Sequence, residues 1–421
     1  MFLAVTFRGE ATATARTKYV TTAALRRERR GLAKAGDRTE ANVANSRCVY
    51  WAGRLFALCD GAKPHQMDPL SVATQKLSEL GGALADATDS FEGWARIDAA
   101  KQRLVNAKVE RAAAAGLFAL FGAGDKASSQ LAISEFDSNF KQLEGITRLD
   151  LARGDVVLDW CVTASSYVGV VLGADGRAGL VGRRRPGAGS GDGIWRVALS
   201  QDEGTAARIV NAYDDANGRV VMDVIYEPVA GASAAPGRQA FGSLVRLVVD
   251  AAAGKVDRSV LYAGEVGGCA ISAAERSSAH SVIFAAARNG AMIRVDSATG
   301  ASQRWAAPAG TVVGAPTLAG DANEFVLCLL HAPGATSVAV FDAAAVDAGP
   351  VGTAALRAEL PRAMLDGPFV SSLRPTLKEV QSAEVLARLY ARKSTEWNEI
   401  EGGFSGLGIK TFLFPKGVSG G

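Results

Sequence analysis

Short apolar stretches separated by Gly- and Asp-containing turns follow one another along most of the chain. Residues 42–69 show the pattern most clearly: Val49–Trp51 is apolar and β-prone, 52–54 contains a turn glycine, Leu55–Cys59 is apolar again, and Asp60-Gly61 breaks the run. Short runs of β-prone residues bounded by turn residues are typical of strands joined by tight loops. The pattern therefore predicts a β-hairpin in this segment.

An aspartate at the head of a tight loop recurs, in two cases with a glycine at its tail. It is found at Asp98, at Asp250 with Gly254, and at Asp296 with Gly300. Such loops suit hairpin turns, and evenly spaced hairpins without strand–helix–strand units favour a β-propeller. Residues 1–22 add two predicted strands, and the arginine-rich run 25–34 is predicted to be a solvated face.

Composition narrows the function classes. The 421 residues are 48% apolar and 21% charged, with a formal net charge of +3, so no nucleic acid is expected as a partner. Five scattered cysteines without a C-x-x-C pair predict free thiols rather than a zinc site or a disulfide framework. The sequence shows no signal peptide and no apolar run long enough for a membrane-spanning helix, which leaves cytoplasm and plastid open as compartments.

Two segments depart from the strand pattern. The apolar run Ala112–Gly124 suits a buried insert better than a peripheral membrane contact, although both readings remain open. Residues 376–399 have helical spacing and precede a Gly-rich tail. We therefore predict a propeller domain over 1–374 and a C-terminal extension over 375–421.

Several motifs resemble the carotenoid cleavage oxygenase family. The hallmark segment is matched by Asn45, Gly53, Arg54, Leu55, Ala57, Leu58, Asp60, Gly61, Pro64, Met67, Asp68 and Pro69. Further stretches at 210–226, 241–272 and 294–369 follow the family in order. The resemblance implies an all-β, seven-bladed-type β-propeller. Family members carry a further stretch before this start, so one blade is expected to be incomplete at the N-terminus, through truncation or an incomplete gene model.

The resemblance also implies a reaction, the oxidative cleavage of a carotenoid or apocarotenoid double bond by O₂ at Fe²⁺. The family holds this iron with four histidines, supported by carboxylates. The four ligand positions are occupied here by Trp94, Leu158, Arg208 and Asp366. The supporting positions are occupied by Asp60, Gly267 and Ala315, of which only Asp60 keeps a carboxylate.

These replacements are unsuited to iron as a set. An indole nitrogen only donates hydrogen bonds, leucine has no lone pair, and a guanidinium is a permanent cation. The chain has three histidines, and none falls at a ligand position: His65 is expected in a turn, His280 at the head of a strand and His331 at the end of one. We therefore predict no metal cofactor and assign no catalytic residue.

Three functions remain open at this point. The first is a catalytically degenerate propeller that binds a carotenoid, an apocarotenoid or another lipophile, or serves as an interaction platform. The second is an active dioxygenase with an unorthodox metal site, and the third is a pure protein-interaction scaffold. The sharpest structural expectation is an ion pair between Arg208 and Asp366 on the propeller axis, beside Trp94 and Leu158.

Overall fold

The computed structural model describes residues 2–8, 12–31, 44, 47–69, 71–86, 89–93, 95–111, 129–188, 193–199, 205–227 and 241–356. They belong to a compact unit, Met1–Ser371. A second unit, Ser372–Gly421, lies outside the described residues, and so does Ala112–Gly124. The predictions for those two segments therefore stay predictions.

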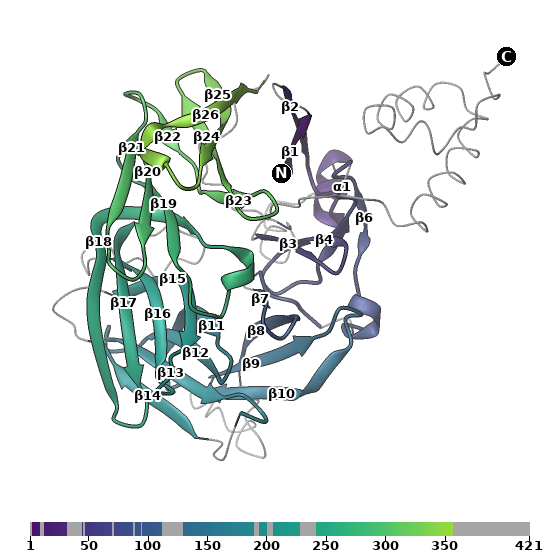
Figure 1. Ribbon diagram of the computed structural model, residues 1–421. Coiled ribbons are helices and arrows are strands. Elements are labelled where there is room, and N and C mark those ends of the chain that lie inside the picture. The colour runs from purple at the N-terminus through teal and green to yellow at the C-terminus, as the bar shows by residue number, and fades with distance from the viewer. Residues whose placement is uncertain are drawn as a thin grey trace. The chain divides into compact units, whose positions relative to one another are not determined.

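Six antiparallel sheets follow one another along the chain and are arranged around a common centre (Figure 1). The first sheet pairs β1 (Phe2–Arg8) with β2 (Thr12–Lys18). The second sheet has four strands, β3 (Arg47–Trp51), β4 (Arg54–Leu58), β5 (His65–Met67) and β6 (Thr74–Leu77). The third sheet has the strands β7 (Arg96–Asp98), β8 (Arg103–Arg111), β9 (Ser129–Phe136) and β10 (Gln142–Asp150). The fourth has the strands β11 (Val156–Val162), β12 (Ser166–Leu172), β13 (Ala178–Arg184) and β14 (Ile194–Ala198).

The last two sheets are larger. The first has seven strands, β15 (Thr205–Asp214), β16 (Val220–Glu227), β17 (Gly242–Asp250), β18 (Lys255–Ala270), β19 (Val282–Ala287), β20 (Ala291–Asp296) and β21 (Ser302–Ala306). The second contains β22 (Val312–Val313), β23 (Thr317–Ala319), β24 (Phe325–Ala332), β25 (Ala335–Asp342) and β26 (Pro350–Ala355). Helical structure among the described residues is limited to α1 (Ala23–Arg29) and the short turns Leu80–Gly82, Ala273–Glu275 and Val346–Ala348.

Strand β18 joins two blades of the propeller. Its first part pairs with β17, and its last part, Val266–Ala270, pairs with β19. The outer strand of one blade thus continues without a break as the first strand of the next. If the seven-stranded sheet is counted as two blades that share β18, the six sheets give seven blades, and the first has two described strands. The predicted all-β, seven-bladed-type propeller is therefore confirmed, and the incomplete N-terminal blade stays a prediction.

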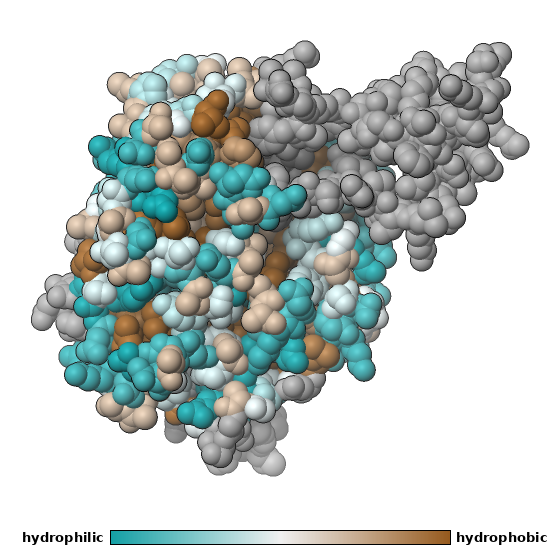
Figure 2. Space-filling model, in the orientation of Figure 1, coloured by the Kyte–Doolittle hydropathy of each residue, from teal (hydrophilic) through white to brown (hydrophobic). Residues whose placement is uncertain are grey.

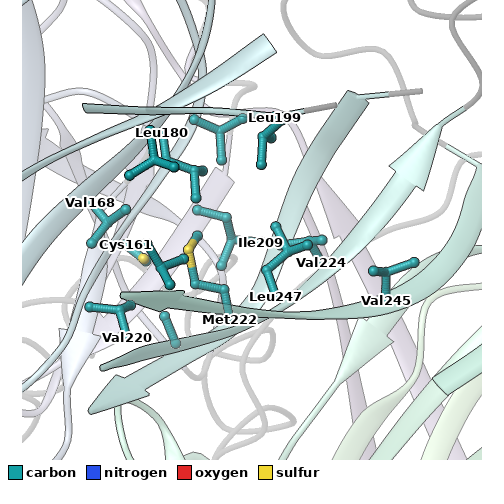
Figure 3. Packing of buried hydrophobic residues seen from close by; sticks show 14 of the residues in the cluster. Cys161, Val168, Leu180, Leu199, Ile209, Val220, Met222, Val224, Val245 and Leu247 are labelled. Atoms are coloured by element: carbon teal, nitrogen blue, oxygen red, sulfur yellow. The ribbon is translucent and has the colours of Figure 1, made fainter. Parts of the chain in front are cut away.

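Apolar residues fill the spaces between neighbouring sheets. One cluster joins the sheet β11–β14 to the strands β15–β17, and includes Val168, Leu180, Ile209, Met222 and Leu247 (Figure 3). All five are at most 2% exposed. Comparable clusters lie between the other pairs of consecutive sheets from β3 onward. Central strands such as β12 and β16 are buried along almost their whole length, so they present apolar residues to both faces of their sheets.

The loops headed by aspartate close as predicted. Asp250 Oδ1 accepts the backbone N–H groups of Ala252 and Ala253 at 3.1 and 2.9 Å, between β17 and β18. Gly254 completes this turn with a φ of +63°, in the left-handed region that favours glycine. Asp296 and Gly300 repeat the arrangement between β20 and β21. The hairpin prediction from local turn chemistry is therefore confirmed.

Two turn glycines allow a matched test of packing. Both have positive φ, but a Cβ on Gly290 would lie 2.5 Å from the Thr311 carbonyl oxygen, whereas one on Gly254 would meet nothing within 4 Å. Gly254→Ala should therefore cost only the strain of a left-handed alanine, about 1 kcal/mol, and Gly290→Ala about 2–3 kcal/mol. Urea unfolding of both variants measures the difference, and equal losses would contradict this packing.

The arginine-rich run is solvated where it is described. Arg26, Arg27 and Arg29 lie on α1 and are exposed, and the Thr22 hydroxyl caps the helix by accepting the Leu25 N–H at 3.1 Å. On the face shown in Figure 2, apolar residues form several separate patches among polar ones. Among the described residues, no helix has both the length and the apolar character needed to cross a membrane.

A buried charge cluster joins the sheets β7–β10 and β11–β14. The Arg185 guanidinium is 1% exposed and donates to Asp98 Oδ2 and to Glu135 Oε1, both at 2.5 Å. It also donates to the Thr163 carbonyl oxygen at 2.8 Å and stacks on the Tyr167 ring. A buried cation needs this many partners, because removal from water costs several kcal/mol per ion.

Glu135 is the second centre of this cluster. Besides Arg185, it accepts hydrogen bonds from the Tyr167 hydroxyl at 2.7 Å and from the Arg103 guanidinium. Burial alone would raise the pKa of Glu135, but the bonds from Arg103 and Tyr167 and the charge of Arg185 hold it below its usual value. The cluster therefore stays ionised at neutral pH and ties two blades together.

Candidate functional site

Two of the four predicted ligand positions lie on neighbouring strands of consecutive blades. β7, β11 and β15 are the first strands of three consecutive blades, and β11 contacts both β7 and β15; we call the three strands the inner strands. Leu158 lies on β11 and Arg208 on β15, and both are half-buried. Trp94 precedes β7 and lies outside the described residues, as does Asp366. The Arg208–Asp366 ion pair therefore stays a prediction.

Asp159 ties the inner strands together. It follows Leu158 on β11, and its Oδ1 accepts the Arg96 Nη2–H from β7 at 2.5 Å. Its Oδ2 accepts the backbone N–H of Ile209 from β15 at 2.8 Å. Arg96 strengthens the contact through its Nε–H, which donates to the Trp160 carbonyl oxygen at 3.1 Å. One carboxylate thus links β7, β11 and β15, and two of the four predicted positions, Leu158 and Arg208, lie on these strands.

The surroundings of Asp159 keep it charged. Burial on its own would raise its pKa, but the Arg96 charge, the hydrogen bond from the Ile209 N–H and the hydrogen bond from Arg96 lower it below its usual value. Asp159 is 8% exposed, so these partners act with little screening by water. The tie is therefore ionic at neutral pH.

A second tie lies just beyond the first. Asp214, the last residue of β15, accepts the Thr163 hydroxyl at 2.9 Å with Oδ1 and the backbone N–H of Ser165 at 2.7 Å with Oδ2. The Ser165 hydroxyl adds a bond of 2.9 Å to Oδ1. The turn after β11 is thereby attached to the end of β15.

The retained carboxylate Asp60 bonds to backbone next to the first predicted ligand position. Its Oδ1 accepts the Gly93 N–H at 2.9 Å, while Glu92 Oε2 accepts the Gly61 N–H at 2.8 Å. Burial, with a smaller contribution from the Asp60 charge, raises the pKa of Glu92. This reciprocal pair locks the turn after β4 to the segment that leads into β7.

The other two supporting positions offer no side chain that could orient a ligand. Gly267 is buried in β18, and Ala315 is half-buried between β22 and β23. Glu265 lies two residues before Gly267, but its carboxylate is half-exposed and pairs with Arg288 at 3.1 Å. No carboxylate from this part of β18 therefore replaces the one that the family uses.

Arg208 brings a permanent cation to the inner strands. Its charge acts on Cys269 of β18: burial raises the pKa of that thiol to about 12, and Arg208 opposes the shift. Cys269 therefore stays a neutral thiol and is a poor metal ligand, because metals bind the thiolate. All five cysteines are free, as predicted.

The three histidines lie elsewhere and are all buried. The prediction that His65 lies in a turn is wrong: it begins strand β5 and is 5% exposed. His331 lies near the end of β24 as predicted, and His280 lies two residues before β19. His65 follows a proline, which suggests a turn, but its pairing with Ala57 and Leu77 places it inside a sheet.

Iron does not fit the described residues. Of the predicted positions that the structure places, Leu158 has no lone pair and Arg208 is a cation. In the described part of the chain, no group of three or more His, Cys, Asp or Glu side chains is placed to hold a metal ion. The acidic residues that surround the inner strands are instead used in ion pairs and backbone hydrogen bonds.

Sequence reasoning missed Arg96 and Arg185. Arg96 is a single arginine between apolar neighbours and Arg185 ends a run of three, and their partners are far away in the chain. Arg96 lies two residues after the first predicted ligand position, Trp94, and could have been questioned for that reason. Nothing in the run 183–185, three arginines before a proline, distinguishes the buried one from the others.

Comparisons with known proteins agree with this architecture. Residues 1–171 match the model of the retinal pigment epithelial membrane protein family. A segment of 45 residues is 47% identical to apocarotenoid-15,15'-oxygenase of Synechocystis sp. and covers 11% of this chain and 9% of that protein. The aligned segment thus spans about a tenth of the curated relative.

Solved structures match over most of the chain. The crystal structure of cobalt-substituted Synechocystis ACO superimposes with a TM-score of 0.70 at 19% identity, over 88% of this chain and 87% of that one. An ACO/RPE65 chimera gives a TM-score of 0.71 at 20% identity over the same shares. These matches show the seven-bladed propeller fold. The sequence match to the retinal pigment epithelial membrane protein family covers the first 171 of the 421 residues, and over most of the chain the fold is similar to that of the Synechocystis ACO structure.

Proposed function

We propose that this chain is a carotenoid oxygenase family member that has lost iron-dependent cleavage and binds a carotenoid, an apocarotenoid or another lipophilic molecule without cutting it. One observation carries the proposal. The chain has three histidines, and the structure assigns all of them to buried positions in β5, in β24 and before β19. A centre of four imidazoles cannot be assembled from them.

The hydrogen bonds that hold the inner strands together favour a binding function over a protein whose central site has collapsed. Asp159 and Thr163 are the residues that the family motif has at these positions, and Asp214 stands where the motif has a glutamate. Their hydrogen bonds hold β11 against β15 and β7. If the protein still binds a molecule at this centre, we expect the metal-ligating side chains to be lost while the hydrogen bonds between the strands are kept. Leu158 packs against the apolar cluster between the blades that begin with β11 and β15, and supplies no metal ligand.

The class of ligand is taken from the relative. The curated protein that shares the 45-residue segment is named as an apocarotenoid oxygenase, and apocarotenoids are long, apolar polyenes. A polyene gains affinity mainly by leaving water, which needs no metal. Binding of such a molecule can therefore survive the loss of iron.

The test is titration of the purified protein with an apocarotenoid in dilute detergent, followed by absorbance and by product analysis. A saturable shift of the polyene spectrum at one molecule per chain, with no shortened aldehyde in the products, is the expected result. Cleavage would overturn the proposal in favour of an active enzyme with an unorthodox metal site. Absence of saturable binding would overturn it in favour of a pure interaction scaffold.

A further inference from the structure

Strand β10 forms the outer edge of the sheet β7–β10, and no described strand pairs with its open side. Successive residues of an antiparallel strand point their backbone groups alternately to one neighbour and to the other. The Leu151 N–H, directly after β10, donates to the Ser129 carbonyl oxygen of β9 at 2.9 Å. Arg148 and Asp150 therefore direct their backbone N–H and C=O groups away from the sheet. An edge of this kind can pair with a strand from another molecule.

Two arginines of the next blade face this edge. Arg183 of β13 and Arg196 of β14 lie on the same face of their sheet, because Val181 pairs with Arg196 and stands two residues before Arg183. Val181 belongs to the apolar cluster between the two blades, so this face is turned towards the sheet β7–β10. Strand β13 also contacts β10 of the neighbouring blade (Figure 1). Both arginines therefore extend from their sheet towards β10.

Each arginine binds one of the outward carbonyl groups of β10. Arg183 Nη1–H donates to the Arg148 carbonyl oxygen at 2.5 Å, and Arg196 Nη2–H donates to the Asp150 carbonyl oxygen at 2.7 Å. Hydrogen bonds from a charged donor are about twice as strong as neutral ones. The two acceptors that an incoming strand would need here are therefore already bound to cations.

Asp155 holds Arg196 in place. Its Oδ2 accepts the Arg196 Nη1–H at 3.0 Å and the Ala152 backbone N–H at 2.7 Å. The Asp155 side chain is 6% exposed, whereas that of Arg196 is 42% exposed. A nearly buried carboxylate thus directs a partly exposed arginine onto the edge, at the cost of the freedom of a long side chain.

We propose that Arg183 and Arg196 close the β10 edge against pairing with the β10 edge of a second copy of this chain. Two-fold antiparallel pairing about Leu149 would place Arg148 of each copy opposite Asp150 of the other, so the charges of β10 itself favour a second copy as the partner. An incoming N–H would have to displace a guanidinium from its carbonyl oxygen, and the displaced cation would lose that hydrogen bond.

The test is the association of the double variant Arg183→Ala, Arg196→Ala, followed by analytical ultracentrifugation from micromolar to near-millimolar concentration. Its weight-average mass should rise with concentration towards twice the mass of the chain, above that of the unsubstituted protein at the same concentrations. The control double variant Arg177→Ala, Arg184→Ala also removes two positive charges, both exposed, and should match the unsubstituted protein. Association no greater than that of the control would overturn the proposal.

Hydrogen exchange identifies the edge that pairs. In the associated double variant, the backbone N–H groups of Arg148 and Asp150 should gain protection as the concentration rises. Adding Asp150→Pro to this variant removes an outward N–H without removing a bond to β9, so the mass should return to that of the unsubstituted protein. Association that leaves exchange at these two residues unchanged, or that survives the proline, would overturn the proposal.

If the double variant fails to fold, the single variants Arg183→Ala and Arg196→Ala decide, because each frees one carbonyl oxygen of β10. Association above the control in either of them, with protection gained at Arg148 and Asp150, is the expected result. No association in both would overturn the proposal.

Discussion

Replacing Arg185 with leucine is expected to lower the free energy of unfolding by about 3–5 kcal/mol. Leucine removes the cation that Asp98 and Glu135 share, and both carboxylates stay where water cannot reach them, at 1% and 6% exposure. Arg103 still reaches Glu135, but the one hydrogen bond that Asp98 keeps from a described residue is that of the Lys101 backbone N–H. Chemical unfolding at neutral pH measures the loss.

The control for this variant is Arg177→Leu. Arg177 also pairs with an aspartate, Asp175, but both side chains are at least 60% exposed. Exposed pairs contribute little, so the loss should stay within about 0.5 kcal/mol. Similar losses for the two variants would show that the Arg185 cluster is not buried between the sheets as described.

The second large effect is expected at the inner strands. Asp159→Ala removes the only carboxylate that accepts from both Arg96 and the Ile209 N–H in the described network. We expect a loss of about 3 kcal/mol, because the buried Ile209 N–H loses its carboxylate acceptor and the half-buried Arg96 guanidinium loses its counter-ion, although Arg96 still donates to the Trp160 carbonyl oxygen. The double variant Arg96→Met, Asp159→Leu should lose less than the two single losses added together.

The pH dependence of this effect has a defined sign. The pKa of Asp159 is lowered in the folded protein, so its contribution is present above the unfolded value of about 3.9 and is lost as the pH falls towards the folded value. The difference in stability between the unsubstituted protein and Asp159→Ala should therefore shrink below about pH 4. A difference that stays constant down to about pH 2 would contradict an ionic tie.

Local turn chemistry made much of the fold predictable. Asp250 and Gly254 bond within a single loop, so the residues that define the turn stand side by side in the sequence. His65 shows the limit of this reasoning, since its strand is defined by pairing with β4 and β6 and not by its immediate neighbours. The shared strand β18 was also beyond prediction, because nothing in its sequence marks where its partner changes.

The candidate site was predictable only in part. The resemblance to the family pointed to Leu158 and Arg208, and the structure places them on adjacent inner strands. What holds those strands together is the Arg96 side chain and the Ile209 backbone N–H. A backbone donor carries no signal in the sequence, and a buried arginine looks like an exposed one until the sheets are assembled.

The most direct test of the account is the iron content of the purified protein after dialysis. A chain whose predicted ligand positions hold Trp94, Leu158, Arg208 and Asp366 should retain far less than one iron per molecule, even when it is expressed with added iron. Mass spectrometry of the metal, with the protein concentration from its six tryptophans, gives the ratio. About one iron per chain, together with cleavage of an apocarotenoid by the same sample, would contradict the account.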